Sequence, residues 1–236
     1  MFEAIFLSYL AGAAIPAGGA IAAIEHIRPL WLERELRHTV IAFGGGALLA
    51  AVALVLVPEG MNGLPGSLSS MSFLAGGIGF FFLDRLIAVR GGQAAQFMAM
   101  LLDFIPEAIA LGATFASGGT YGPLLAFLIG LQNLPEGFNA FRELTISSHI
   151  TRKRTISVFL LLPFLGPLAA FIGIMVFARH TSLLAVLMLF CAGGILYLTF
   201  QDIAPQAKLA KHWAPPLGAV AGFVLGMIAK ILTASP

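Results

Sequence analysis

The sequence predicts an all-α, polytopic membrane protein, and three observations lead to that prediction. The 236 residues are 59% hydrophobic and only 10% charged, which is more apolar surface than a soluble domain of this size can bury. Apolar runs of about 20 residues recur along the chain, and a helix of about 20 residues spans the hydrocarbon core of a bilayer. The intervening segments are short, so we expect a single transmembrane domain over residues 1–236.

Eight apolar segments can be laid out, and each is expected to form one membrane helix. Their approximate ranges are 4–24, 38–58, 70–89, 93–116, 121–143, 156–178, 182–203 and 214–233. The first segment could be mistaken for a secretory signal. However, Glu3 stands where a signal carries basic residues, and the apolar run from Ile5 to Ala23 is long for a signal core. We therefore expect it to remain as the first membrane helix.

Small residues are concentrated in several of these segments. Segment two contains Gly44–Gly46, and segment eight carries Gly218, Gly222 and Gly226, which are spaced every four residues and so share one face. Small residues let helices approach closely in lipid, so we expect these stripes to serve packing rather than chemistry.

The distribution of Lys and Arg predicts the orientation in the membrane. Eleven of the thirteen lie in or beside the loops after segments one, three, five and seven: Arg28, Arg34, Arg37, Arg85, Arg90, Arg142, Arg152, Lys153, Arg154, Lys208 and Lys211. Because positively charged loops stay in the cytoplasm, we expect both termini outside a cell inner (plasma) membrane.

Charge and cysteine content exclude several classes of function. The formal net charge is only +2, and no basic stripe indicates nucleic-acid binding. The single cysteine, Cys191, excludes an intramolecular disulfide and a cluster of thiolate metal ligands. We expect no prosthetic group.

Segments four and five carry polar residues in the middle of apolar helices. The turn over 117–120 joins the two segments, so they are expected to run antiparallel. Asp103 and Glu107 then lie about as far from the turn as Gln132 and Glu136, and each pair is spaced i,i+4 on one face. The sequence therefore predicts a cluster of these four side chains near the bilayer centre, with Asn133 at its edge.

A proline stands beside each glutamate and is expected to kink its helix. Pro106 cannot donate to the carbonyl of Leu102, and Pro135 cannot donate to that of Leu131. Lipid cannot satisfy such a carbonyl, whereas a cation or a water molecule can.

Carboxylates in a membrane helix indicate a functional site, and these helix cores contain no basic residue to pair with them. A bound cation would supply the missing charge, and we favour this interpretation. A proton relay and structural acids held protonated are the alternatives.

The two motifs resemble those of the ZIP family of divalent metal transporters, and are most similar to its bacterial GufA-like branch. The resemblance rests on residues 132–137, Gln-Asn-Leu-Pro-Glu-Gly, on the Pro-Glu pair one helix earlier, and on residues 201–206, Gln-Asp-Ile-Ala-Pro-Gln, at the end of segment seven. It implies a 3+2+3 bundle of eight helices, a homodimer, and transport of zinc or a neighbouring divalent ion into the cytoplasm between helices four and five.

Carried over position by position, the resemblance assigns roles to individual residues. Glu107 and Glu136 match the bridging acids of the family, and Gln132 and Asn133 match its polar pair. Gln201, Asp202 and Gln206, at the end of segment seven, are expected to line a path for the ion toward the cytoplasm.

Three positions depart from the family pattern. Asp103 stands where the family usually has His, Phe104 where it usually has Asn or another ligand, and Gly166 where the branch tends to have Glu. We therefore expect one metal ion rather than a binuclear centre. An all-oxygen site of this kind favours Mn²⁺, Fe²⁺ or Co²⁺ over Zn²⁺, although affinity at any site still rises toward the later metals; Cd²⁺ is a further candidate substrate.

Other functions remain open at this point. The chain could be a proton-coupled carrier of another solute, or a divergent homologue that does not transport. An intramembrane metal-dependent hydrolase is a third alternative, but such a site normally has His ligands, and within the segments a His stands only at an end, His38. We expect a transporter rather than an enzyme.

Overall fold

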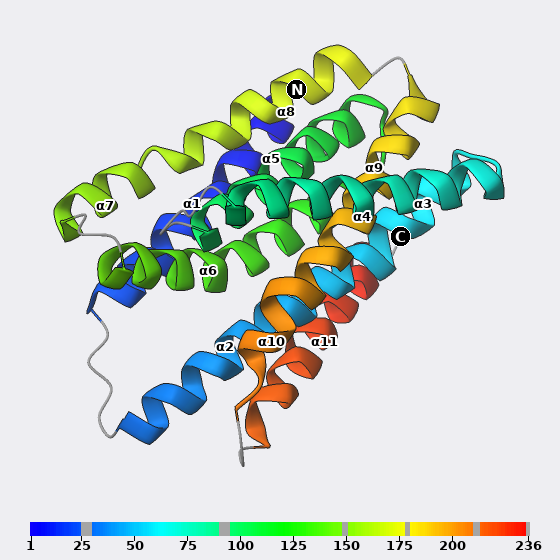
Figure 1. The fold of residues 1–236 in the computed structure, drawn as a ribbon. Helices are drawn as coiled ribbons and strands as arrows, with labels where there is room; N and C mark the ends of the chain where they lie inside the picture. The colour runs from blue at the N-terminus through cyan, green and yellow to red at the C-terminus, as the bar shows by residue number, and fades with distance from the viewer. Residues whose placement is uncertain (25–29, 90–94, 148–150, 178–179, 210–212, 235–236) are drawn as a thin grey trace.

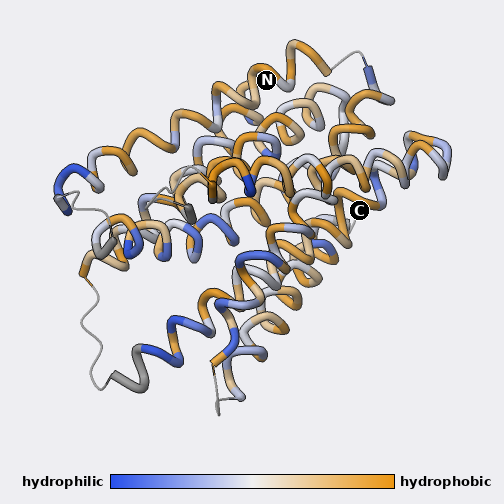
Figure 2. The backbone as a smooth tube through the Cα atoms, viewed as in Figure 1, coloured by the Kyte–Doolittle hydropathy of each residue, from blue (hydrophilic) through white to orange (hydrophobic). Residues whose placement is uncertain are grey.

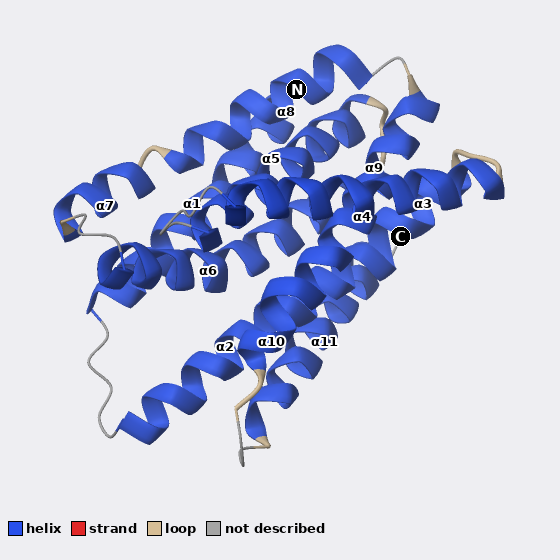
Figure 3. Ribbon diagram, in the orientation of Figure 1, coloured by secondary structure: helices blue, strands red, loops and turns tan. Residues whose placement is uncertain are grey.

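A computed structural model describes residues 1–24, 30–89, 95–147, 151–177, 180–209 and 213–234, and within these ranges every regular element is a helix (Figures 1 and 3). The α-helices are α1 Phe2–Ile24, α2 Leu30–Ala51, α3 Val57–Asn62, α4 Gly66–Val89, α5 Ala95–Ala116, α6 Gly122–Ser147, α7 Arg152–Phe159, α8 Leu165–Phe177, α9 Thr181–Leu198, α10 Ala204–Ala207 and α11 Ala214–Ala234. Two π-helical turns, η1 Val52–Leu56 and η3 Thr199–Ile203, and one 3₁₀ turn, η2 Leu162–Phe164, join some of them.

Seven stretches of the described residues are long and apolar enough to cross a membrane, which confirms an all-α, multi-pass membrane protein. They are Phe2–Ile24, Arg34–Asn62, Gly66–Ile87, Phe97–Ala116, Arg152–Phe177, Thr181–Ala207 and Ala214–Thr233. The remaining predicted segment, the fifth, is α6, whose 26 residues are long enough but include Gln132, Asn133 and Glu136. Figure 2 shows blue, hydrophilic stretches within α6.

Each of the eight predicted segments overlaps a helix or a run of consecutive helical turns. The largest differences lie at helix ends. The second segment begins at Leu30 rather than at residue 38, and the seventh continues through η3 and α10 to Ala207 rather than ending at residue 203. Residues 93, 94 and 178 of the predicted ranges lie outside the described residues. The same holds for the topology residues Arg28, Arg90 and Lys211.

Four pairs of helices that run parallel to each other make up most of the packing: α1 with α6, α2 with α11, α4 with α9, and α5 with α8. In every pair a glycine of each helix lies against the backbone of the other, so that an added Cβ would sit within 2.2 Å of a carbonyl oxygen. These glycines are Gly18 and Gly137, Gly46 and Gly222, Gly76 and Gly193, and Gly112 and Gly173. The expectation that small residues serve helix packing is confirmed for these positions.

The pairs assemble into two groups of four segments. One group contains α1, α5, α6 and α8, and the other contains α2 with α3, α4, α9 with α10, and α11. The two groups meet chiefly where α2 lies on α6 and where α9 lies on α5. The ZIP-like 3+2+3 arrangement stays an expectation from the family resemblance.

The triple glycine of α2 packs at the junction between the two groups. A Cβ on Gly44 would lie 2.7 Å from the Cγ of Pro135 in α6, and one on Gly45 would lie 2.9 Å from the Cγ2 of Ile203 in η3. The third, Gly46, faces the carbonyl of Ala219 in α11. One short stretch of backbone thereby approaches three different elements.

Replacing Gly46 with Ala is expected to destabilise the protein by about 1–3 kcal/mol, because its Cβ would meet the Ala219 oxygen at 2.0 Å and push α2 and α11 apart. Unfolding of the purified protein in mixed micelles measures the change. Gly66→Ala is the matched control, since nothing lies within 4 Å of a Cβ there. Equal stability of the two variants would contradict the close approach.

Candidate functional site

The turn between α5 and α6 sets the two polar motifs opposite each other. Gly118 has a φ of 76°, a left-handed conformation that favours glycine, and the Gly119 amide donates to the carbonyl of Thr114. The two helices therefore fold back antiparallel, as predicted. Both Pro106 and Pro135 lie inside α-helices, and the stretches of other helix type lie at η1, η2 and η3.

Gln132 connects the two helices at the level of the acids. Its Nε2 donates to the Oε2 of Glu107 at 2.6 Å and to the Oδ2 of Asp103 at 3.4 Å. Glu107 and Gln132 are fully buried, and Asp103 is 4% exposed. The predicted meeting of these three side chains is observed, and one amide group bridges two carboxyl groups.

The cluster contains more buried acceptor oxygens than donors. Among the described residues, five buried side-chain oxygens have no hydrogen-bond partner: Oδ1 of Asp103, Oε1 of Glu107, Oε1 of Gln132, Oδ1 of Asn133 and Oε2 of Glu136. All five belong to the residues predicted as metal ligands. Buried polar atoms are normally satisfied, so this group of oxygens requires an explanation.

Asn133 does not join the cluster in the way expected. Its Nδ2 donates to the carbonyl of Ala11 in α1 at 2.9 Å, and the side chain is fully buried. Adjacent residues on a helix point about 100° apart, so Gln132 and Asn133 face different neighbours. Its amide ties α6 to α1, while its oxygen remains without a donor.

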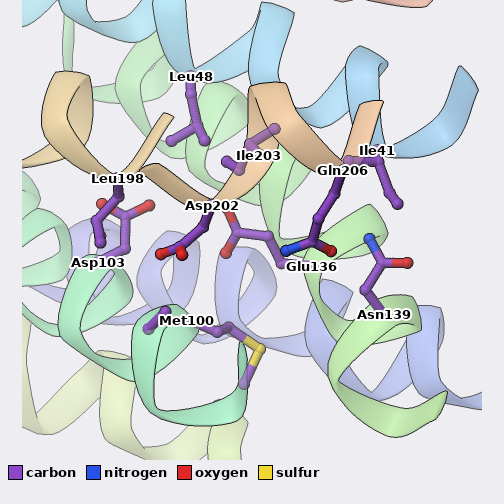
Figure 4. Close-up of a pocket in the computed structure, with 11 residues that line it drawn as sticks. Ile41, Leu48, Met100, Asp103, Glu136, Asn139, Leu198, Asp202, Ile203 and Gln206 are labelled. Carbon is purple, nitrogen blue, oxygen red and sulfur yellow. The ribbon is translucent and has the colours of Figure 1, made fainter. Parts of the chain in front are cut away.

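A cavity of about 60 Å³ lies beside the cluster, between the two groups of helices. Asp103, Glu136 and Asn139 line it from α5 and α6, and Asp202 and Gln206 line it from η3 and α10. Figure 4 shows the carboxyl groups of Asp103, Glu136 and Asp202 turned into this space, with the amide of Gln206 beside Glu136. The cavity extends from the acids toward the end of the bundle where α2 begins and α10 ends.

The three predicted path residues do not share one position. Asp202 and Gln206 line the cavity, as the prediction requires. Gln201 is exposed and lines a different, shallow depression beside Gly77 and Tyr197. The assignment of Gln201 to the same path is therefore not supported by its position.

Several residues of the cavity wall were not predicted as site residues, Asn139 and Met100 among them. Asn139 follows Glu136 by three positions, and Met100 precedes Asp103 by three, so helical spacing was the available signal. Met100 is 2% exposed and lines the cavity, whereas Met98 is 39% exposed.

The side chain of Phe104 packs against α1 and α8. It is fully buried, and a Cβ added at Gly12 or Gly166 would lie 2.9 or 3.1 Å from its Cζ. A Cβ at Gly166 would also lie 2.4 Å from the carbonyl oxygen of Ser8. The resemblance expects further ligands at positions 104 and 166. These two positions are thus adjacent, and the phenyl ring of Phe104 occupies the space between them.

The structure does not by itself show a metal centre. Within the described residues, no three His, Cys, Asp or Glu side chains converge closely enough to hold a metal ion. The residues brought together are Asp103, Glu107 and Gln132, with Glu136 close enough for its charge to act on both acids.

Comparison with known proteins adds no identification. No family model matches the chain, and no curated protein matches it either. The resemblance to the ZIP family therefore rests on the motifs in helices α5 and α6 and at the end of the seventh segment.

Proposed function

We propose that the protein transports divalent transition-metal ions across a membrane through the cluster of Asp103, Glu107, Gln132 and Glu136. The observation that carries the proposal is the set of buried acceptor oxygens without donors, all on the predicted ligands. α5 contains no Lys or Arg, and the one in α6, Arg142, stands six residues beyond Glu136. A divalent cation would provide both the missing positive charge and the missing partner for these oxygens.

The position of the cavity supports a path for the ion toward one end of the bundle. Asp202 and Gln206 extend the polar lining beyond Asp103 and Glu136. On the other side of the cluster lie fully buried apolar side chains, among them Leu111 of α5 and Leu128 of α6. Transport would then require a second conformation that opens this apolar layer.

The direction of transport follows from the charge pattern. If the loops rich in Lys and Arg are cytoplasmic, the cavity faces the cytoplasm and both termini lie outside. The transported ion would then be released inward from an inner (plasma) membrane. A homodimer is a further expectation of the resemblance, and the cluster is composed of residues from one chain.

The donor set favours a hard ion and a single one. Carboxylate and amide oxygens suit Mn²⁺, Fe²⁺ or Co²⁺ better than imidazole-rich sites do. Phe104 occupies the space in which a second set of ligands would stand, and Gly166 adds no side chain there. Both features support one ion at the cluster.

A transport function is favoured over the alternatives by the same residues. A hydrolase would need a stable metal site, and the amide of Gln132 with its neighbouring acids offers no imidazole ligand. A carrier of an organic anion would need a basic group beside the acids, and the lining of the cavity contains none. We therefore propose no catalytic residues.

Uptake by proteoliposomes tests the proposal. The wild type, reconstituted alone, is expected to take up at least one of Mn²⁺, Fe²⁺, Co²⁺, Zn²⁺ and Cd²⁺, and Glu107→Ala with Glu136→Ala is expected to abolish uptake. Glu3→Gln, at an exposed position of α1, is the matched control and should keep wild-type uptake. Absence of uptake of every metal by the wild type, or unchanged uptake by the double variant, would overturn the proposal.

A further inference from the structure

A second and larger hollow lies on the lipid side of the bundle. Its volume is about 480 Å³, and it lies between α2, the η3–α10 segment and α11. We call it the lateral groove; its lining is Ala42, Gly45, Leu49, Thr199, Phe200, Ile203, Ala204, Ala207, Lys208, Leu209, Trp213, Pro216 and Ala219. Apart from Ile203, none of these residues lines the carboxylate cavity.

Small side chains make the lateral groove hollow. Ala42 and Gly45 form the α2 wall, Ala204 and Ala207 form the α10 wall, and Ala219 contributes from α11. The π-helical turn η3 and the short helix α10 carry the chain past α2, and Ile203 packs against Gly45 at the floor. The result is a cleft between three elements whose lining is almost entirely apolar.

The dimensions of the lateral groove match one leaflet of a bilayer. Thr199 and Ala207 lie at its two ends on the η3–α10 wall, and eight residues of helix rise by about 12 Å. One leaflet contributes about half of the ~30 Å hydrocarbon core. An acyl chain that enters from the membrane interface would therefore run along most of the depth of its leaflet.

Among the described residues that line the lateral groove, Lys208 carries a positive charge and Trp213 an indole ring, and the two lie close in sequence at one end of it. Lys208 is exposed, and no carboxylate among the described residues pairs with it. Trp213 is 88% exposed, and tryptophan is typical of the level at which lipid headgroups lie. A long basic side chain at this level attracts anionic lipid.

We propose that the lateral groove binds an anionic phospholipid, with one acyl chain between α2, α10 and α11 and the phosphate-bearing headgroup at Lys208. The small residues supply the space for the chain, and Lys208 supplies selectivity for negative charge. Ile203 forms a wall of both the lateral groove and the carboxylate cavity, so the bound chain would pack against the segment that carries Asp202. This site is independent of metal binding.

Fluorescence quenching by brominated lipids tests this proposal. The chain has two tryptophans, so in a Trp31→Phe background Trp213 is the single reporter. The protein is reconstituted in bilayers containing equal mole fractions of acyl-brominated phosphatidylglycerol or acyl-brominated phosphatidylcholine. The expected result is about fivefold higher apparent affinity for phosphatidylglycerol, which corresponds to the ~1 kcal/mol that one Lys contributes at an anionic surface.

Variants separate the lateral groove from general attraction to the membrane. Lys208→Gln should remove the preference, Lys208→Arg should retain it, and Lys153→Gln, an exposed residue of α7, should leave it unchanged. Ala207→Leu should lower quenching by both lipids by filling the space for the chain. Equal quenching of the wild type by the two lipids, a preference that survives Lys208→Gln, or unchanged quenching in Ala207→Leu would overturn the proposal.

Discussion

Neutralising the two bridged acids, with Asp103→Asn and Glu107→Gln, is expected to make the metal-free protein more stable. We expect the free energy of unfolding to rise by roughly 1–3 kcal/mol, because two buried acids without a counter-charge are replaced by neutral amides of the same shape. The amide that replaces each carboxyl group keeps an oxygen to accept from Gln132. Unfolding in mixed micelles containing a chelator measures the difference.

The same variant is expected to lose stabilisation by metal. An ion that binds only the folded state stabilises it by mass action, by about 2.7 kcal/mol at a hundred times its dissociation constant. The wild type should therefore gain stability when Mn²⁺ is added, while the neutralised variant should not. Glu3→Gln controls for a change of one exposed charge. A neutralised variant that is less stable than the wild type in chelator would mean that the acids serve the fold.

The second large effect is expected in affinity. Glu107→Gln should weaken binding of Mn²⁺ by about a hundredfold or more, since losing one buried charged partner costs about 3 kcal/mol or more. Glu107 is fully buried, and its free Oε1 has no other partner among the described residues. The fold should be preserved because the substituted side chain has the same shape.

One ion per chain is expected in the wild type. Phe104 is fully buried, and its ring lies beside Gly12 and Gly166, so the space at these positions is already filled. A second ion would need ligands at those positions. Equilibrium dialysis of the purified protein against Mn²⁺ counts the bound ions.

The helical segments could be predicted because each is an apolar run of sufficient length. The pairing of α5 with α6 followed from their short connection, and the meeting of Gln132 with Asp103 and Glu107 followed from equal distances to the turn. Helical periodicity predicts which residues share one face of a helix and at what depth they lie.

Helix ends and the directions of individual side chains could not be predicted from the sequence pattern. The α-helical start of α2 at Leu30 includes charged residues that resemble a loop, and the π-helical turn η3 changes the direction of the side chains that follow. Within this turn Asp202 lines the cavity whereas its neighbour Gln201 does not. The orientation of Asn133 toward Ala11 depends on the packing of α1.

The central claim is that the oxygens of the α5–α6 cluster bind a divalent metal ion. Equilibrium binding of Mn²⁺ to the purified protein, compared with Glu107→Gln and with Glu3→Gln, tests it most directly. The account predicts one bound ion per chain in the wild type and in Glu3→Gln, and about a hundredfold weaker binding in Glu107→Gln. No bound ion in the wild type, or equal binding by Glu107→Gln, would contradict it.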